Sequence, residues 1–136
     1  MKRVIVIGSS NTDMVVNSPV IPVPGETVIG GNFAVYQGGK GANQAVAAAR
    51  AGADVIFIAC VGNDPMGNEA LAGYEKERIN TSTIQRVPNA ATGVAVILVN
   101  ETDGQNSILV TPGANNHLTE SQIKKAEHFF TKDSIL

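Results

Sequence analysis

The feature that most constrains the fold is an uninterrupted apolar run over residues 55–61. A shorter run of β-branched residues covers residues 4–7 and ends at Gly8. A strand with one face in water alternates apolar and polar residues, whereas a strand buried on both faces is apolar throughout. The two runs therefore predict an α/β fold in which helices cover both faces of a sheet.

Three helices are predicted from the signals at their ends. These signals are an alanine-rich run closed by glycine, a proline at a first helical position and a capping box. They predict helices at residues 42–51, at residues 65–78 and from Thr119 onward. Residues 134–136 resemble the opening of another strand, so we expect the natural architecture to continue beyond Leu136.

Composition excludes several classes of function. The chain is 43% hydrophobic and 16% charged, which is typical of a globular domain. Its net charge of −2, without a basic stripe, predicts no nucleic-acid or membrane partner. No apolar stretch is long enough for a membrane span, and the single cysteine, Cys60, fits a small core residue in a reducing compartment. We therefore expect a cytoplasmic protein.

A glycine cluster, GGKGAN at residues 38–43, precedes the first predicted helix. Glycines at a helix start let backbone N–H groups approach a ligand. A P-loop would need glycine in place of Ala34 and serine or threonine in place of Gly41. A dinucleotide-binding motif would need its glycines directly after the first strand, where residues 8–11 read GSSN. Neither kind of nucleotide site is supported.

Residues 38–45, followed by Gly52 and Gly62, closely resemble the first signature of the ribokinase (PfkB) family of carbohydrate kinases. Segments 11–13, 24–27 and 92–95 are also similar to that family. The resemblance spans nearly the whole chain but only the front part of the family's architecture. It implies a partial, ribokinase-like three-layer core over residues 1–136 with a small lid of β-strands, and an absent C-terminal part that binds ATP.

The resemblance also implies a sugar site. Its substrate-binding residues would be Asn11, Thr12, Asp13, Gly39, Lys40, Gly41, Ala42 and Asn43. Asn11 and Asp13 are two residues apart on an extended segment, so their side chains share a face. A carboxylate accepts from neighbouring hydroxyls, and an amide both donates and accepts. Without the resemblance, these two residues are equally typical of a turn, Asn43 of a helix start and Lys40 of a solvated loop.

The family's lid strands correspond to residues 14–17, 27–36, 93–100 and 107–111. The resemblance implies that they cover the sugar, with Ala95 and Ile97 in contact with it, and that they pair with a second subunit. Asp103 and Gly104 separate two of the apolar runs, which independently predicts a hairpin. Strand 93–100 is apolar on both faces and needs cover on both. The alternative is that these residues form a strand of the central sheet.

Several family motifs are missing. The catalytic aspartate of the family lies in a Gly-Ala-Gly-Asp motif, and an Asn-x-x-Glu motif is linked to Mg²⁺; neither occurs here. We therefore expect no catalytic residue and no metal ligand in this chain, with the catalytic groups C-terminal to Leu136. The resemblance implies ATP and Mg²⁺ as cofactors of the full-length enzyme and leaves open a monovalent cation, and none of these is expected to bind strongly to this chain. Asn115 and Asn116 are assigned to a turn, although contact with a ligand stays open.

The leading hypothesis is an ATP-dependent kinase that phosphorylates D-ribose at O5 to give ribose 5-phosphate. The chain alone is expected to be inactive, and its partners would be the sugar and a second copy of itself. One alternative is another PfkB sugar or nucleoside kinase, such as a fructokinase-like enzyme. A second is a non-catalytic module that dimerises through its lid strands, and a third is a pseudogene product without a stable fold.

Overall fold

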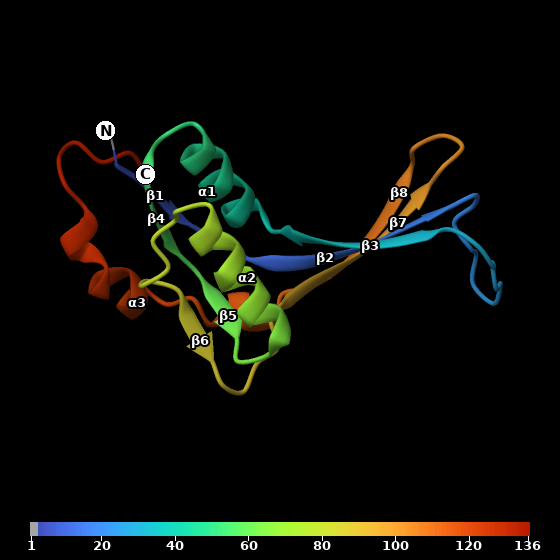
Figure 1. The fold of residues 1–136 in the computed structure, drawn as a ribbon. Coiled ribbons are helices and arrows are strands. Elements are labelled where there is room, and N and C mark those ends of the chain that lie inside the picture. Colours follow the sequence, from blue (N-terminus) through green and yellow to red (C-terminus); the bar gives the residue numbers. More distant parts are fainter. Residues whose placement is uncertain (1–2) are drawn as a thin grey trace.

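The computed structural model describes residues 3–136 and shows a core of sheet and helices from which a second sheet extends (Figure 1). In chain order the strands and α-helices are β1 (Arg3–Ile7), β2 (Asn11–Ser18), β3 (Asn32–Gly38), α1 (Lys40–Arg50), β4 (Asp54–Ile58), β5 (Cys60–Gly62), α2 (Pro65–Lys76), β6 (Gln85–Val87), β7 (Gly93–Asn100), β8 (Asn106–Thr111) and α3 (Glu120–Lys125). The 3₁₀ helices are η1 (Gly113–His117) and η2 (Glu127–Phe129).

The core strands are parallel. β1 pairs with β4 along its whole length, and β5, which follows β4 directly, pairs with β6. Single bridges place Ile135 beside Val4 and Asn80 beside Ile56, so a further parallel segment lies on each side. Parallel neighbours need long crossover connections, and helices α1 and α2 supply them here.

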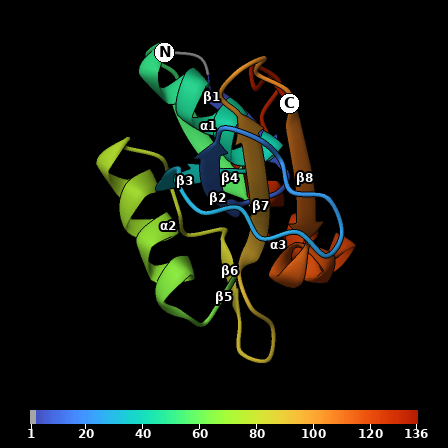
Figure 2. The same cartoon turned by 90° about the vertical axis from the view of Figure 1, so that its right-hand side faces the viewer.

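Helices cover both faces of the core sheet, as the apolar runs predict (Figure 2). On one face, α1 and α2 pack over a cluster in which the rings of Phe57 and Tyr74 meet edge to face at 5.3 Å. On the other face, α3 and the turn after it cover Ile5 and Ile58. Every residue in the run 55–61 is buried. The predicted three-layer α/β core is therefore confirmed.

Helices α1 and α2 begin and end within two residues of their predicted bounds. α1 begins two residues earlier than predicted, because Gly39, with a φ of 96°, serves as its N-cap. It ends before Gly52, whose φ of 89° fits the predicted closing glycine. α2 begins at Pro65 as predicted and stops two residues before Arg78, which takes a φ of 61°.

Helix α3 is shorter than the capping pattern suggests. Thr119 accepts the N–H of Gln122 at 3.3 Å, as a capping box requires, but regular helix ends at Lys125. In a full capping box the Gln122 side chain would accept the backbone N–H of Thr119. It does not do so here, because the Gln122 amide is buried in the core. It donates to the carbonyls of Ala59 at 2.7 Å and Thr83 at 3.0 Å.

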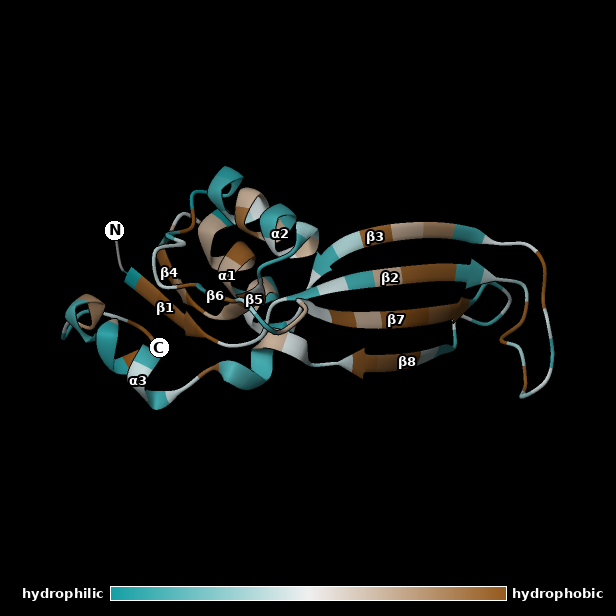
Figure 3. Ribbon diagram, turned by 90° about the horizontal axis from the view of Figure 1, so that it is seen from below, coloured by the Kyte–Doolittle hydropathy of each residue, from teal (hydrophilic) through white to brown (hydrophobic). Residues whose placement is uncertain are grey.

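The outer sheet has the strand order β3-β2-β7-β8, with β2 and β7 parallel and both outer pairs antiparallel. It contains the four segments predicted as lid strands and is separate from the core sheet (Figure 3). β2 begins at Asn11, three residues before the predicted range 14–17. β3 begins at Asn32 rather than at residue 27, since Gly30 and Gly31 have φ values of 126° and 102° that interrupt extended pairing.

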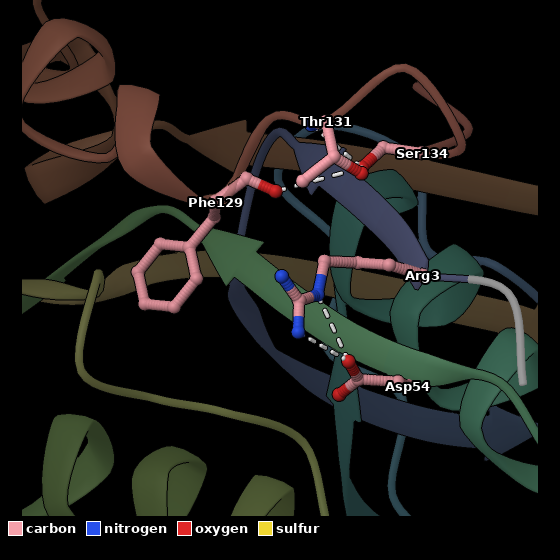
Figure 4. Close-up of polar contacts among 5 residues, drawn as sticks. All are labelled: Arg3, Asp54, Phe129, Thr131 and Ser134. Atoms are coloured by element: carbon pink, nitrogen blue, oxygen red, sulfur yellow. Dashed lines mark hydrogen bonds and ion pairs between the residues drawn. The ribbon is translucent and has the colours of Figure 1, made fainter.

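The C-terminal residues lie beside β1. Ile135 donates its N–H to the carbonyl of Arg3 at 2.9 Å, and Ile5 donates to the carbonyl of Ile135 at 2.8 Å, as a further strand would. The Arg3 guanidinium donates to Asp54 at 2.9 Å and lies 5.9 Å from the ring centre of Phe129 (Figure 4). These contacts join β1, β4 and the segment after η2.

Candidate functional site

A cavity of about 450 Å³ lies where the outer sheet meets the core. The start of β2 and the N-terminus of α1 supply most of its polar lining, and β7 and β8 form an apolar wall. The lining residues are Ser9, Asn11, Asp13, Gly39, Lys40, Asn43, Ala95, Ile97, Ile108, Val110, Pro112 and Asn115. The cavity thus brings together most of the predicted site residues; the exceptions are Thr12, Gly41 and Ala42.

Three consecutive residues of β2, Asn11, Thr12 and Asp13, were predicted to bind the sugar, but they do not all face the cavity. Successive side chains on a strand point to opposite faces, so Asn11 and Asp13 share the face that lines the cavity. Thr12 points to the other side, is 1% exposed, and its hydroxyl has no partner among residues 3–136. Thr12 is therefore absent from the cavity lining.

Two glycines leave space for the polar side chains of β2. Gly38 of β3 pairs with Asn11, and a Cβ at this glycine would overlap the carboxylate of Asp13. Gly93 of β7 pairs with Asn11 from the other side, and a Cβ there would overlap the Asn11 side chain. Any larger residue at either position would displace a polar group that lines the cavity.

The N-terminus of α1 packs tightly against the connection between β1 and β2. Ala42 donates its N–H to the carbonyl of Ser9 at 3.0 Å. A Cβ at Gly41 would lie only 2.7 Å from the carbonyl carbon of Gly8, so this close approach requires glycine. Gly41 and Ala42 are buried in this contact and hold the helix in place, which is why they do not line the cavity.

Lys40 and Asn43 are the two α1 side chains that line the cavity. They are three residues apart and therefore lie on the same face of the helix. No side chain caps α1, because its N-cap is Gly39, so the amide of Asn43 is not used as a cap. Lys40 forms no ion pair with any residue between 3 and 136. Both groups are available to a ligand.

Asp13 is the one carboxylate among the described residues that line the cavity. Partial burial raises the pKa of its carboxyl above the usual 3.8, and no hydrogen bond from residues 3–136 offsets the effect. An ionised carboxylate offers only acceptor sites. A ligand that donates hydroxyl groups would restore the hydrogen bonds that the carboxylate loses on leaving water.

The apolar wall of the cavity comes from the β7–β8 hairpin. Ala95 and Ile97 line the cavity, together with Val110 and Ile108, which are their cross-strand partners. Neither of the two β8 residues was predicted to belong to the site. A two-residue turn at residues 103–104 would already place them on this face, so the signal was present in the predicted hairpin.

Asn115 of η1 was assigned to a turn, but its side chain lines the cavity. Its Nδ2 donates to Oδ1 of Asn11 at 2.8 Å, and its Oδ1 accepts the backbone N–H of Ser10 at 2.9 Å. Asn116, the next residue, is exposed. The contact joins residues 104 positions apart in the chain, so no local pattern could have indicated it.

Other candidate residues have structural roles or none that is visible. Cys60 is buried, donates its thiol to Gln122 at 3.1 Å, and has its pKa raised by that burial. Over residues 3–136, no group of three His, Cys, Asp or Glu side chains is placed to hold a metal ion. The same stretch contains no helix with the length and apolar character of a membrane span.

Comparison with known proteins agrees with this geometry. Residues 1–136 match the model of the pfkB family of carbohydrate kinases. The chain is 44% identical to the ribokinase of Haemophilus influenzae over 126 residues, which cover 93% of the chain and 41% of that protein. The structure of Giardia lamblia ribokinase matches with a TM-score of 0.85 at 37% identity, covering 93% of this chain and 38% of that one. Arabidopsis thaliana ribokinase, solved in complex with ribose and ATP, matches with a TM-score of 0.73 at 34% identity, covering 84% and 37%.

The TM-scores show that these solved kinases share the fold of the chain over the matched residues. The chain belongs to the pfkB family of carbohydrate kinases. It spans about two fifths of the length of the relatives named above.

Proposed function

We propose that this chain is the sugar-binding part of a cytoplasmic, ATP-dependent ribokinase, which phosphorylates D-ribose at O5 to give ribose 5-phosphate. The observation that supports the proposal is the convergence of Asn11 and Asp13 from β2 with Lys40 and Asn43 from α1 around one cavity. These residues are far apart in sequence, and separate turn or capping roles would not require them to meet. The ribokinase relatives agree with this substrate.

The lining offers what a small sugar needs. Asp13 accepts hydrogen bonds from hydroxyls, Lys40 donates, and the amide of Asn43 does both. Hydrogen bonds to a charged group contribute about 1.5–3 kcal/mol each, so two or three of them would orient a pentose. Ala95 and Ile97 present apolar surface to the carbon skeleton of the sugar.

The chemical step requires groups that the cavity does not supply. Phosphoryl transfer uses a carboxylate to position or deprotonate the attacking hydroxyl, and Mg²⁺ with N–H donors to stabilise the moving charge. Among the described residues the cavity has one carboxylate, Asp13, which this proposal uses to bind the sugar. We therefore propose that the catalytic aspartate, and the residues that bind ATP, Mg²⁺ and any monovalent cation, lie outside this chain.

The outer sheet serves in this proposal both as a lid and as a dimer interface. Ala95 lies on the face that lines the cavity. The opposite face exposes Phe33, Val35, Val96 and Leu109, which are 64%, 45%, 41% and 73% exposed. An apolar sheet face of this kind needs cover, and the same face of a second copy would supply it. This face also supports the second candidate function, a non-catalytic module that dimerises through its lid.

Calorimetric titration of the chain with D-ribose tests the sugar site. We expect binding that is preferred over D-fructose and adenosine. Asp13→Asn should weaken it at least about tenfold, which corresponds to 1.4 kcal/mol. Asp103→Asn, in the exposed turn of the β7–β8 hairpin, is the matched control and should bind as the wild type does. Absence of ribose binding, or equal affinity in Asp13→Asn, would contradict the proposal.

An assay of ADP release tests where the catalytic groups lie. With ATP, Mg²⁺ and D-ribose present, the 136-residue chain should show no turnover above its sugar-free background. Ribose-dependent turnover by the chain would show that a catalytic carboxylate and a nucleotide site do lie within these residues.

A further inference from the structure

We infer that Asn115 is a positioning residue, which fixes the side-chain amide of Asn11 so that Asn11 turns a donor toward the sugar. The inference rests on the proposed sugar site. Asn115 belongs to η1, directly after β8, whereas Asn11 begins β2. The two side chains meet where the outer sheet joins the core.

Backbone groups determine the orientation of the Asn115 amide. Its Nδ2 lies 3.1 Å from the carbonyl of Ser10, 2.8 Å from the carbonyl of Pro112 and 2.8 Å from Oδ1 of Asn11, and its Oδ1 accepts the N–H of Ser10 at 2.9 Å. An amide NH₂ group has two hydrogens, so one of them is shared between two of these three acceptors. A carbonyl can only accept, and a backbone N–H can only donate. The flipped amide would set its oxygen against two carbonyls and its NH₂ group against a donor. The orientation shown is therefore the one that satisfies all three groups.

The orientation of Asn11 follows from that of Asn115. Because Nδ2 of Asn115 faces Asn11 at 2.8 Å, the Asn11 atom in contact must be an acceptor, which is Oδ1. The NH₂ group of Asn11 then remains for the cavity that this residue lines. Gly93 makes the contact possible, since a Cβ there would overlap both amides.

This arrangement gives the two β2 residues opposite hydrogen-bonding roles. Asp13 can only accept when it is ionised, and the part of Asn11 left for the ligand can only donate. Two neighbouring hydroxyls satisfy both residues, because one donates to the carboxylate while the other accepts from the amide. Asn115 thus contributes to selectivity for a diol without being required to touch it.

A double-mutant cycle measured by calorimetric titration of the chain with D-ribose tests this inference. Asn11→Ala and Asn115→Ala should each weaken binding about tenfold. The double variant should be at most about twofold weaker than Asn11→Ala, because Asn115 acts through Asn11. Asn116→Ala, one residue further along η1 and exposed, is the matched control and should bind normally.

Two results would overturn the inference. One is a loss in the double variant that equals the product of the single losses, about a hundredfold, which would mean that Asn115 acts independently of Asn11. The other is normal binding by Asn115→Ala. Thermal unfolding of each variant identifies any that loses affinity because it no longer folds.

A sugar-free measurement separates this inference from the proposed function. The side-chain amide resonances of Asn11 can be assigned in a ¹⁵N-labelled chain by their loss in Asn11→Ala. They should shift in Asn115→Ala but not in Asn116→Ala. Identical Asn11 resonances in the wild type and Asn115→Ala would contradict the positioning role. If the wild type binds no ribose, the proposed function fails, and this spectrum alone decides whether Asn115 fixes Asn11.

Discussion

The hydroxyl of Thr92 donates to Oδ1 of Asp64 at 2.7 Å, and the backbone N–H of Thr92 donates to Oδ2 of the same carboxylate at 2.7 Å. Asp64 also caps α2 by accepting the N–H of Gly67 at 2.8 Å. The Thr92 hydroxyl accepts in turn from Gly62 at 3.0 Å. One carboxylate therefore joins the end of β5, the start of α2 and the residue that precedes β7.

Removal of this carboxylate should destabilise the fold. Asp64→Ala is expected to lower the free energy of unfolding by about 2–4 kcal/mol, because it removes a helix cap and leaves buried donors without an acceptor. Urea unfolding measures the change. Asp133→Ala, which replaces an exposed carboxylate, should stay within about 0.5 kcal/mol of the wild type. Equal effects of the two substitutions would contradict the role assigned to Asp64.

The Asp64 carboxylate should also make the free energy of unfolding decrease in acid. Burial alone would raise the pKa of Asp64, but hydrogen bonds from Thr92 and Gly67 and the charge of Arg86 together lower the pKa below 3.8. A carboxyl with a depressed folded-state pKa stabilises the fold above its unfolded-state pKa and loses that contribution as the pH falls further. Urea unfolding between about pH 7 and pH 3 should show a smaller decrease for Asp64→Asn than for the wild type. The same decrease in both would be the contrary result.

Asp13 should show a conflict between stability and binding. Burial raises the pKa of the Asp13 carboxyl in the folded protein. The protonated carboxyl therefore stabilises the fold at low pH, and this contribution is lost as the pH rises through the folded-state pKa. At neutral pH the ionised carboxylate destabilises the fold. Asp13→Asn removes the charge and should raise the melting temperature at neutral pH while it abolishes tight ribose binding. Differential scanning calorimetry with and without ribose measures both effects. A lower melting temperature at neutral pH would show that the charge contributes to folding.

The glycines beside β2 should be required for binding. Gly38→Ala and Gly93→Ala each place a Cβ on a cavity side chain and should reduce ribose affinity at least about tenfold. Gly73→Ala in α2 is the matched control, because the nearest atom outside its own helix, on the Gln37 side chain, would be 3.9 Å from the added Cβ. That substitution should add about 0.5–1 kcal/mol of stability and leave affinity unchanged. Normal ribose binding by both sheet variants would contradict this account of the cavity.

A charge on the exposed face of the outer sheet should prevent dimerisation. Leu109→Lys changes a side chain that is 73% exposed in one copy, so the fold of each copy should be little affected. We expect the wild type to sediment as a dimer and Leu109→Lys as a monomer. Asp103→Lys, at the exposed turn, should behave as the wild type. A monomeric wild type would remove the proposed interface.

Much of the core could be predicted because its signals are local. An apolar run over residues 55–61 can only be buried on both faces, and Gly52 ends its helix through a conformation that glycine favours. The start of β3 and the length of α3 could not be predicted in this way. The first depends on the backbone at Gly30 and Gly31, and the second on a core position that takes the Gln122 side chain.

The motifs indicated which stretches of sequence meet at the cavity more accurately than they indicated which side chains line it. A motif marks a stretch of sequence, but the strand turns Thr12 away from the cavity, and the helix start uses Gly41 for packing. Asn115 reaches the site through a contact between η1 and β2 that forms only when the core and the outer sheet come together. A contact between residues so far apart in the chain produces no local pattern from which a single sequence could predict it.

The cavity draws its polar groups from two parts of the fold, the outer sheet and the core. Asn11 and Asp13 lie on β2 of the outer sheet, whereas Lys40 and Asn43 lie on α1 of the core. Any change in how β2 is placed relative to α1 would alter the distances between these two pairs of side chains and leave the spacing within each pair unchanged. A ligand that contacts all four side chains would therefore connect the outer sheet to the core. Its affinity would depend on how β2 is placed relative to α1.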